Sequence, residues 1–273
     1  MLAQSPPDRY LTFCRRLEHD MIKETTRHAH HGDMQMKTGD CDVVILCGGL
    51  GTRLRSVVGD RPKPMADIGG KPFVRLLVEH IASYGLDRFI LSVGYKAGMI
   101  GDYFRAGNLP VKVEIAVESE PMGTAGGLRN SRALIRADTA LVLNGDSFCR
   151  VDYAAMIEAH LDRNACATIA VVPTENAAEF GSIRAAKDGR ITAFEEKKGG
   201  GGGLINAGVY VFRKTAIDAM PSRIPLSLEK DVFPGLTSGI LLSFPVSGPL
   251  YDIGTPAGYA RAQSDLPGIM ATK

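Results

Sequence analysis

The chain has 273 residues, 45% of them hydrophobic and 23% charged, which is the composition of an ordinary folded globular protein. Its 32 Lys and Arg residues nearly balance 30 Asp and Glu residues, so the net charge of +2 excludes a broad basic surface for nucleic acid or acidic membranes. No apolar run is long enough to span a membrane, and the first residues do not resemble a signal peptide. These features predict a cytoplasmic protein that binds neither nucleic acid nor membranes.

Residues 1–40 differ in character from the rest of the chain. They hold four of the six histidines and lack the apolar runs that follow. We expect residues 1–40 to form a flexible N-terminal extension and residues 41–273 to form one folded domain. The five cysteines are odd in number and show no C-x-x-C spacing, which favours buried, reduced thiols over disulfides or a zinc site.

From Cys41 onward, short apolar runs alternate with longer amphipathic stretches. The apolar runs predict strands at residues 43–46, 88–93, 111–117, 140–143, 168–172, 205–212 and 241–245. The amphipathic stretches predict helices at residues 72–84, 97–104, 128–135 and 153–163. This alternation is typical of an α/β fold, in which helices cover both faces of a doubly wound, mainly parallel sheet.

A small β insertion is expected near the end of this series. Residues 182–185 and 190–195 read as a short hairpin, and a run of five glycines follows at residues 199–203. Glycine loses unusually large backbone entropy when it is ordered, so we expect this run to form a mobile loop without regular structure. Its position beside charged residues would allow it to act as a lid over a substrate.

The first predicted strand runs directly into a glycine-rich loop. From residue 47 the sequence reads CGGLGTRL, and a Pro-Lys pair follows after seven more residues. Ligands of doubly wound sheets bind at the carboxyl ends of the strands, where glycines let backbone N–H groups approach a phosphate. The loop matches neither the Walker pattern nor the dinucleotide fingerprint, which disfavours an oxidoreductase. Arg53 and Lys63 add two cations, which suits a triphosphate whose pyrophosphate portion leaves.

This loop resembles the signature of the sugar-1-phosphate nucleotidyltransferases. Further segments resemble the same family in the same order: ESEPMGTAG at 118–126, LNGD at 143–146, FEEK at 194–197, NAG at 206–208 and DIGTP at 252–256. In that family these segments are the base-recognition loop, the first metal-binding turn, the lysine that grips the sugar phosphate, a sugar contact and the second metal carboxylate. The resemblance covers residues 41–262 and implies a Rossmann-like sheet of the nucleotidyltransferase type, with residues 41–273 as the catalytic domain.

The resemblance also implies a role for each matching residue. Arg53 and Lys63 would be catalytic, while Asp146 and Asp252 would bind Mg²⁺, which prefers one or two carboxylates together with phosphate oxygens. The residues expected to bind the nucleotide are Gly48, Gly49, Gly51, Thr52, Glu118, Gly123 and Thr124. The residues expected to bind the sugar phosphate are Asn144, Gly145, Glu196, Lys197, Asn206 and Gly208. The acceptor phosphate would then attack the α-phosphorus in line and release pyrophosphate, without a protein nucleophile.

Glu118 bears on the choice of nucleotide. Thymidylyl- and uridylyl-type relatives carry glutamine at the corresponding position, whereas a carboxylate can accept both adjacent N–H donors of guanine. Segments 54–66, 90–96 and 226–233 are most similar to the D-glycero-α-D-manno-heptose 1-phosphate guanylyltransferases, which supply GDP-heptose for capsule, S-layer or lipopolysaccharide synthesis. We therefore expect GTP and this heptose 1-phosphate as substrates.

Several alternatives stay open at this point. The acceptor could be mannose 1-phosphate, which differs from the heptose only beyond C6. The enzyme could use glucose 1-phosphate with CTP, UTP or dTTP, or the chain could be an inactive regulatory paralogue, although Arg53, Lys63, Asp146 and Asp252 are all present. A homo-oligomer is possible, but the sequence contains no obvious interface motif.

Overall fold

The structure is a computed structural model that describes residues 41–49, 51–107, 109–175, 182–195, 202–237 and 241–271. The predicted extension at residues 1–40 and most of the glycine run lie outside the described residues. Gly203 is described, and it is the first residue of a strand. The expectation that the whole run 199–203 lacks regular structure is therefore wrong at its last residue, whose backbone joins the sheet by pairing with Thr174.

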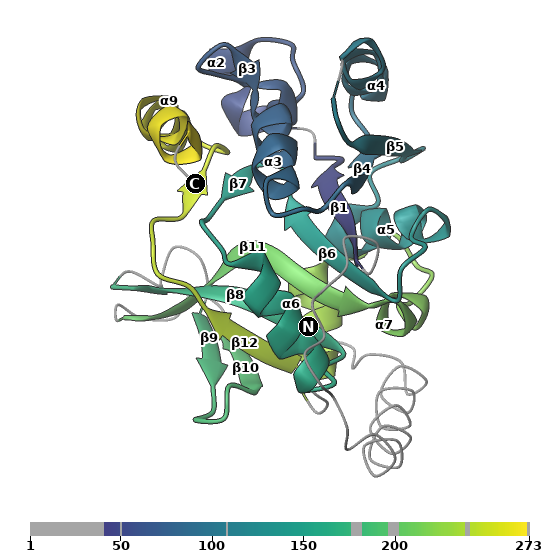
Figure 1. The fold of residues 1–273 in the computed structure, drawn as a ribbon, viewed down its shortest axis with the longest axis vertical. Helices are drawn as coiled ribbons and strands as arrows, with labels where there is room; N and C mark the ends of the chain where they lie inside the picture. Colours follow the sequence, from purple (N-terminus) through teal and green to yellow (C-terminus); the bar gives the residue numbers. More distant parts are fainter. Residues whose placement is uncertain are drawn as a thin grey trace, which may run out of the picture.

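A nine-stranded sheet forms the centre of the molecule, in the order β10-β9-β11-β6-β1-β4-β5, with β8 between β11 and β12 (Figure 1). The parallel half consists of β1 (Cys41–Cys47), β4 (Arg88–Val93), β5 (Lys112–Val117) and β6 (Thr139–Asn144). The other strands are β8 (Ala167–Thr174), β9 (Ser182–Ala185), β10 (Ile191–Glu195), β11 (Gly203–Arg213) and β12 (Leu241–Pro245). β11 runs antiparallel to β6 and β8, and β9 and β10 form the predicted hairpin.

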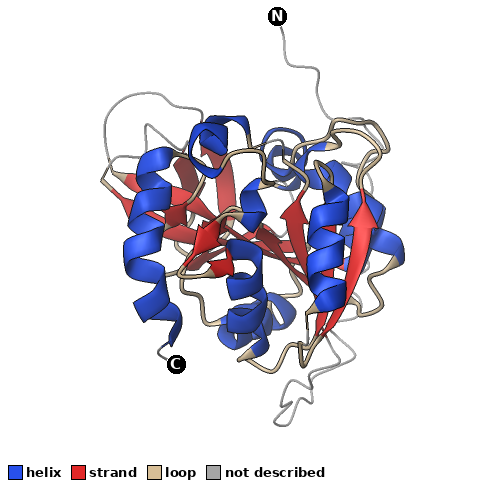
Figure 2. Cartoon of the chain, turned by 90° about the horizontal axis from the view of Figure 1, so that it is seen from above, coloured by secondary structure: helices blue, strands red, loops and turns tan. Residues whose placement is uncertain are grey.

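Helices cover both faces of this sheet (Figure 2). They are α2 (Arg55–Val58), α3 (Phe73–Ala82), α4 (Ala97–Ala106), α5 (Gly123–Asn130), α6 (Tyr153–Asp162), α7 (Lys214–Asp218), α8 (Phe233–Leu236) and α9 (Pro256–Ala271). On β1, the side chains of Val43 and Ile45 pack in the core that α3, α4, α6 and α9 cover. Val44, between them, packs in a second core with α5, α7 and α8. This alternation along a fully buried strand confirms the predicted doubly wound architecture.

The helix predicted at residues 128–135 is displaced in the structure. α5 begins at Gly123 and gives way at Ser131 to a 3₁₀ turn, Ser131–Ala133. The first turn of α5 is glycine-rich, but its Ala125 and Gly126 N–H groups donate to the carbonyl of Leu226, at 2.9 and 3.2 Å. Because the first N–H groups of a helix have no partner within it, this tertiary contact stabilises a start that local propensity does not predict.

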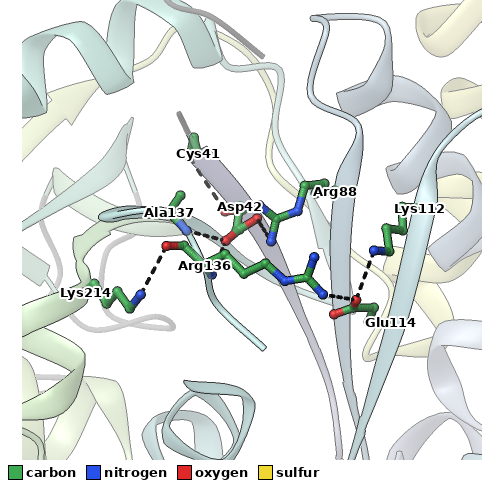
Figure 3. A network of polar contacts seen from close by, with 8 residues as sticks. All are labelled: Cys41, Asp42, Arg88, Lys112, Glu114, Arg136, Ala137 and Lys214. Atoms are coloured by element: carbon green, nitrogen blue, oxygen red, sulfur yellow. Dashed lines mark hydrogen bonds and ion pairs between the residues drawn. The ribbon is translucent and has the colours of Figure 1, made fainter. Parts of the chain in front are cut away.

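A buried carboxylate fastens the amino end of β1 (Figure 3). Asp42 is 0% exposed, and its Oδ2 accepts hydrogen bonds from the backbone N–H groups of Arg136 and Ala137, at 2.6 and 2.8 Å. Its Oδ1 forms an ion pair with Arg88 on β4 at 2.8 Å. Asp42 thus ties together β1, β4 and the turn that leads into β6, so the carboxyl ends of these strands meet at the opposite edge of the sheet.

Two further predictions about the chain can be compared with the structure. Cys41, Cys47, Cys149 and Cys166 are buried thiols that form no disulfide in the described part of the chain, as expected, while Cys14 lies outside the described residues. Within the described ranges, no helix combines the length and the apolar character needed to cross a membrane.

Candidate active site

The loop after β1 places two cations at the carboxyl edge of the sheet. Gly51 has a φ of +59°, a left-handed conformation that glycine adopts without strain. A Cβ at Gly51 would lie 2.9 Å from the Cβ of Lys63, so the lysine packs directly against the turn of the loop. Arg53 follows on the 3₁₀ turn η1 (Thr52–Leu54), where it is exposed. The predicted catalytic pair therefore lies beside the glycine loop.

Two short strands bring the predicted metal carboxylates together. β7 (Ser147–Phe148) begins directly after Asp146, and β13 (Tyr251–Asp252) ends at Asp252. The strands are antiparallel, with Asp252 opposite Ser147, and the N–H of Ile253 donates to the carbonyl of Asp146 at 3.0 Å. Gly145 turns the chain from β6 into β7 and donates its N–H to the carbonyl of Leu46 on β1 at 2.9 Å. The tertiary fold thus joins two aspartates that are far apart in the sequence.

Lys63 occupies the position where these carboxylates converge. Its Nζ lies 2.7 Å from Oδ2 of Asp146 and 3.9 Å from Oδ1 of Asp252. The lysine side chain is only 11% exposed, whereas those of Asp146 and Asp252 are 42% and 39% exposed. The carboxylates therefore favour positive charge between them and still have room for water or phosphate oxygens.

This donor set fits a divalent cation of the Mg²⁺ kind. Hard oxygen ligands, few in number and open to solvent, suit an ion that keeps several waters and takes phosphate oxygens from its substrate. No group of three or more His, Cys, Asp or Glu side chains gathers within the described part of the chain, so a closed all-protein metal cage is not found there. Asp146 and Asp252 are the residues that would hold the ion.

Glu118 lies on the other side of the glycine loop, directly after β5. Its Oε1 accepts a hydrogen bond from Ser92 Oγ at 2.8 Å, and the side chain is 9% exposed. Its Oε2 has no hydrogen-bond partner among the described residues and is not completely shielded from solvent. A Cβ at Gly48 would lie within 2.5 Å of the Glu118 Cδ and Oε2, so the absence of a side chain at Gly48 creates the space for this carboxylate. One oxygen is thus anchored and the other can accept a hydrogen bond from a ligand.

Ser92 is not among the site residues predicted from the sequence. The signal was available, because Ser92 is a polar residue within the apolar run of β4 and is 0% exposed. Burial, followed by the charges of Asp146 and Glu118, raises the pKa of the nearby Cys47 thiol well above the ordinary value and so favours its neutral form.

The residues predicted to contact the sugar lie on β6 and β11. Asn206 accepts a hydrogen bond from the N–H of Gly208 at 2.8 Å through Oδ1, and donates one to the hydroxyl of Tyr210 at 2.8 Å through Nδ2. Gly208 packs against Asn144 and Ser147. Asn144 Oδ1 and Ser147 Oγ are buried and have no hydrogen-bond partner in the described structure. Asn144, Gly145, Asn206 and Gly208 are therefore brought together next to Asp146.

The remaining predicted residues are only partly placed. Glu196 and Lys197 lie outside the described residues, and the side chain of Thr52 is not described. Gly123 and Thr124 form the first turn of α5. The hydroxyl of Thr124 donates to Glu229 Oε2 at 3.0 Å, a partner that the sequence did not predict.

A cavity of about 610 Å³ lies away from these residues, between α3 and the end of α9. Its lining includes Lys71, His80, Tyr84, Arg150 and Met270, none of which belongs to the predicted site. A cavity of this volume is large enough to hold a small ligand. The glycine loop, Lys63 and the two aspartates favour the open edge of the sheet instead, because they bring fixed charges to the carboxyl ends of the strands, where ligands of doubly wound sheets bind.

Comparison with known proteins shows the family to which this chain is similar. The family model described as "Nucleotidyl transferase" matches residues 42–267. The chain is 34% identical to a D-glycero-alpha-D-manno-heptose 1-phosphate guanylyltransferase of Aneurinibacillus thermoaerophilus, over 82% of this chain and 98% of that protein. It is 35% identical to a mannose-1-phosphate guanylyltransferase of Mycobacterium tuberculosis, over 85% of this chain but only 66% of that longer protein. HddC from Yersinia pseudotuberculosis, whose crystal structure is known, is 40% identical in sequence to this chain. The two structures superimpose with a TM-score of 0.74, over 82% of this chain and 99% of HddC. A crystal structure of HddC complexed with GMP-PN is also known.

Proposed function

Because the chain belongs to the nucleotidyl transferase family, we propose that it transfers GMP from GTP to D-glycero-α-D-manno-heptose 1-phosphate and releases pyrophosphate. The observation that carries this proposal is the convergence of Lys63 with Asp146 and Asp252 beside the glycine loop. The names of the Aneurinibacillus relative and the GMP-PN bound to HddC support the choice of acceptor and donor.

The proposed residues act by holding and neutralising charge. Arg53 and Lys63 would bind the triphosphate and stabilise the negative charge on the departing pyrophosphate, while Lys197 would grip the phosphate of the acceptor. An oxygen of that phosphate attacks the α-phosphorus, and the bond between the α-phosphorus and the bridging oxygen of the pyrophosphate breaks. Nucleotidyl transferases generally use a divalent metal ion. We propose that this ion is Mg²⁺, held by Asp146 and Asp252, and that it supplies neutralisation of the phosphate charge.

Glu118 would select the base. Its anchored carboxylate offers Oε2, and the second lone pair of Oε1, to the N1–H and 2-amino groups of guanine. Uracil and thymine present a single N–H donor with flanking carbonyls, and those carbonyls would repel a carboxylate. The geometry therefore favours GTP over UTP and dTTP.

A second acceptor is favoured by a specific observation. The mycobacterial relative that is 35% identical to this chain is named for mannose 1-phosphate. The manno-heptose differs from mannose only by an extension at C6, so a pocket that is open around C6 would accept both sugars. We propose mannose 1-phosphate as this second candidate.

The test is pyrophosphate release from GTP, ATP, CTP, UTP and dTTP, each combined with heptose, mannose or glucose 1-phosphate, in Mg²⁺ and in chelator. We expect metal-dependent release with GTP and the manno-heptose phosphate. Asp146→Asn should lower turnover by orders of magnitude in a folded protein, and Glu118→Gln should weaken the preference for GTP. Full activity of Asp146→Asn would exclude the metal assignment, and an unchanged donor preference in Glu118→Gln would place guanine recognition elsewhere.

A further inference from the structure

A partly buried carboxylate connects the donor side of the site to the acceptor side. Glu229 lies on a π-helical turn, η5 (Leu228–Val232). Its Oε2 accepts hydrogen bonds from Thr124 Oγ1 at 3.0 Å and from Ser227 Oγ at 2.8 Å, and its Oε1 accepts one from the Tyr210 hydroxyl at 3.3 Å. Thr124 belongs to the predicted nucleotide loop, and Tyr210 belongs to the strand that carries the predicted sugar contacts.

On the acceptor side, the contact continues to Asn206. Tyr210 is 0% exposed, and its hydroxyl receives a hydrogen bond from Asn206 Nδ2 at 2.8 Å while it donates to Glu229. Burial, together with the charge of Glu229, raises the pKa of Tyr210 well above its ordinary value, despite hydrogen bonds from Asn206 and Asn144 that act to lower it. The phenol therefore stays protonated and keeps donating to the carboxylate. A continuous series of hydrogen bonds runs from Thr124 through Glu229 and Tyr210 to Asn206.

On the donor side, the backbone reinforces the same contact. The N–H of Leu226 donates to the carbonyl of Met122 at 2.8 Å, and the carbonyl of Leu226 accepts from Ala125 at 2.9 Å. The N–H of Leu228 donates to Thr124 Oγ1 at 2.8 Å. Backbone and side-chain hydrogen bonds therefore attach the segment that carries Glu229 to the predicted nucleotide loop.

The chemistry of Glu229 favours a functional role over a purely structural one. Glu229 is partly buried, and among the described residues three hydroxyl donors and no ion pair replace the water that its carboxylate has lost, which is an uncommon environment for a charged group. π-Helical turns are rare and occur frequently at functional sites. Glu229 combines two unusual features, a carboxylate without an ion pair and a position on a π-helical turn. Such departures from the usual preferences are expected mainly at functional sites.

We propose that Glu229 is a positioning residue that couples nucleotide binding to binding of the sugar phosphate, acting through Thr124 on one side and Tyr210 and Asn206 on the other. This inference rests on the proposed function, because the proposed function places the nucleotide on the Thr124 side and the sugar phosphate on the side of Tyr210 and Asn206. Ordering of the Thr124 loop by the nucleotide would fix Glu229, and Glu229 would then fix Asn206 in the position that receives the sugar. Each ligand should therefore strengthen the binding of the other by the same factor.

The experiment measures this factor directly by calorimetry. The Kd of the manno-heptose 1-phosphate is determined on the full chain with and without a saturating GTP analogue that carries a methylene group between its α- and β-phosphorus, because this bridge cannot be cleaved by the proposed reaction. For the unaltered protein we expect the analogue to lower this Kd by about fivefold or more. In Glu229→Gln, the ratio of the two Kd values should fall to about one, whereas the Kd of each ligand alone should change by less than about threefold, because the substitution keeps the shape of the side chain.

Two further variants make the outcome specific. Asp231→Asn changes a carboxylate on the same turn that faces Arg223 and the N–H of Ser227, so it should keep the full ratio. Tyr210→Phe removes only the hydroxyl between Glu229 and Asn206, and it should lower the ratio even if Glu229→Gln does not fold. The inference is overturned if Tyr210→Phe and any folded Glu229→Gln keep the full ratio, or if Asp231→Asn loses it equally. A ratio of one in the unaltered protein also overturns the inference but leaves the proposed function standing, whereas failure of the unaltered protein to bind either ligand overturns both.

Discussion

The contact between Gly48 and Glu118 gives the sharpest test of the proposed base-recognition site. In Gly48→Ala, the new Cβ would lie within 2.5 Å of both Cδ and Oε2 of Glu118. Carbon atoms in contact are normally about 3.5–4.0 Å apart, so the carboxylate would have to move by about 1 Å or more. The backbone of Gly48 has no positive φ, so the effect of this substitution comes from the lost space alone.

The expected losses of stability and activity in Gly48→Ala follow from this displacement of the Glu118 carboxylate. Overpacking of a filled interior costs about 1–3 kcal/mol in the free energy of unfolding. A displacement of about 1 Å in a positioned group lowers activity by about 100-fold. We therefore expect Gly48→Ala to remain folded but to lose about 1–3 kcal/mol of stability and about 100-fold in kcat/KM for GTP.

The assay combines urea unfolding with pyrophosphate release at varied GTP. Gly49→Ala is the matched control for the unfolding measurement, because a Cβ at the neighbouring position meets no atom within 4 Å and should leave the stability of the folded structure unchanged. In a Glu118→Ala background the clash partner is absent, so adding Gly48→Ala should cost almost nothing further in stability. Additive losses in the double variant, or full stability and GTP use in Gly48→Ala, would show that Glu118 does not lie against Gly48.

Three other substitutions probe the fold and the site. Asp42→Ala should lower the free energy of unfolding in urea by about 3–5 kcal/mol, because it leaves Arg88 and two backbone N–H groups without their buried partner; a loss below about 1 kcal/mol would contradict the structural role assigned to this residue. Burial, followed by the charge of Arg213, lowers the pKa of His160 to about 3. Below about pH 6.5 the His160 imidazole therefore binds a proton in the unfolded chain but not in the folded chain. This difference should lower the free energy of unfolding by about 2 kcal/mol between pH 7 and pH 5. His160→Gln should flatten that dependence, and an identical slope in the variant would refute the assignment. Asp252→Asn should lower kcat for pyrophosphate release by about 100-fold or more without unfolding the protein, and unchanged turnover would remove Asp252 from the site.

The features that sequence predicted well are local ones. Continuous apolar runs identified β1, β4 and β6 because buried parallel strands need apolar side chains on both faces. The glycine loop was recognisable because close approach to a phosphate requires residues without a Cβ at fixed spacing. Asp146 was placed correctly at the end of β6, since a turn residue that follows an apolar strand must lie at the edge of the sheet. Local patterns therefore predicted the position of the glycine loop and of Asp146, whereas Asp252 was named by the resemblance to the sugar-1-phosphate nucleotidyltransferases, and the metal and phosphate roles stay predictions.

The features that only the tertiary structure revealed depend on contacts between segments that are distant in the sequence. The contact between Lys63 and Asp146 joins residues 83 positions apart, and that between Thr124 and Glu229 joins residues 105 positions apart. Periodicity and propensity describe neighbours along the chain, so they contain no information about such pairs. The early start of α5 and the antiparallel direction of β11 have the same origin, because the hydrogen bonds that stabilise them come from Leu226 and from β6 and β8. The sequence thus determined which chemical groups the candidate site contains, whereas the packing of the chain decided which of them touch.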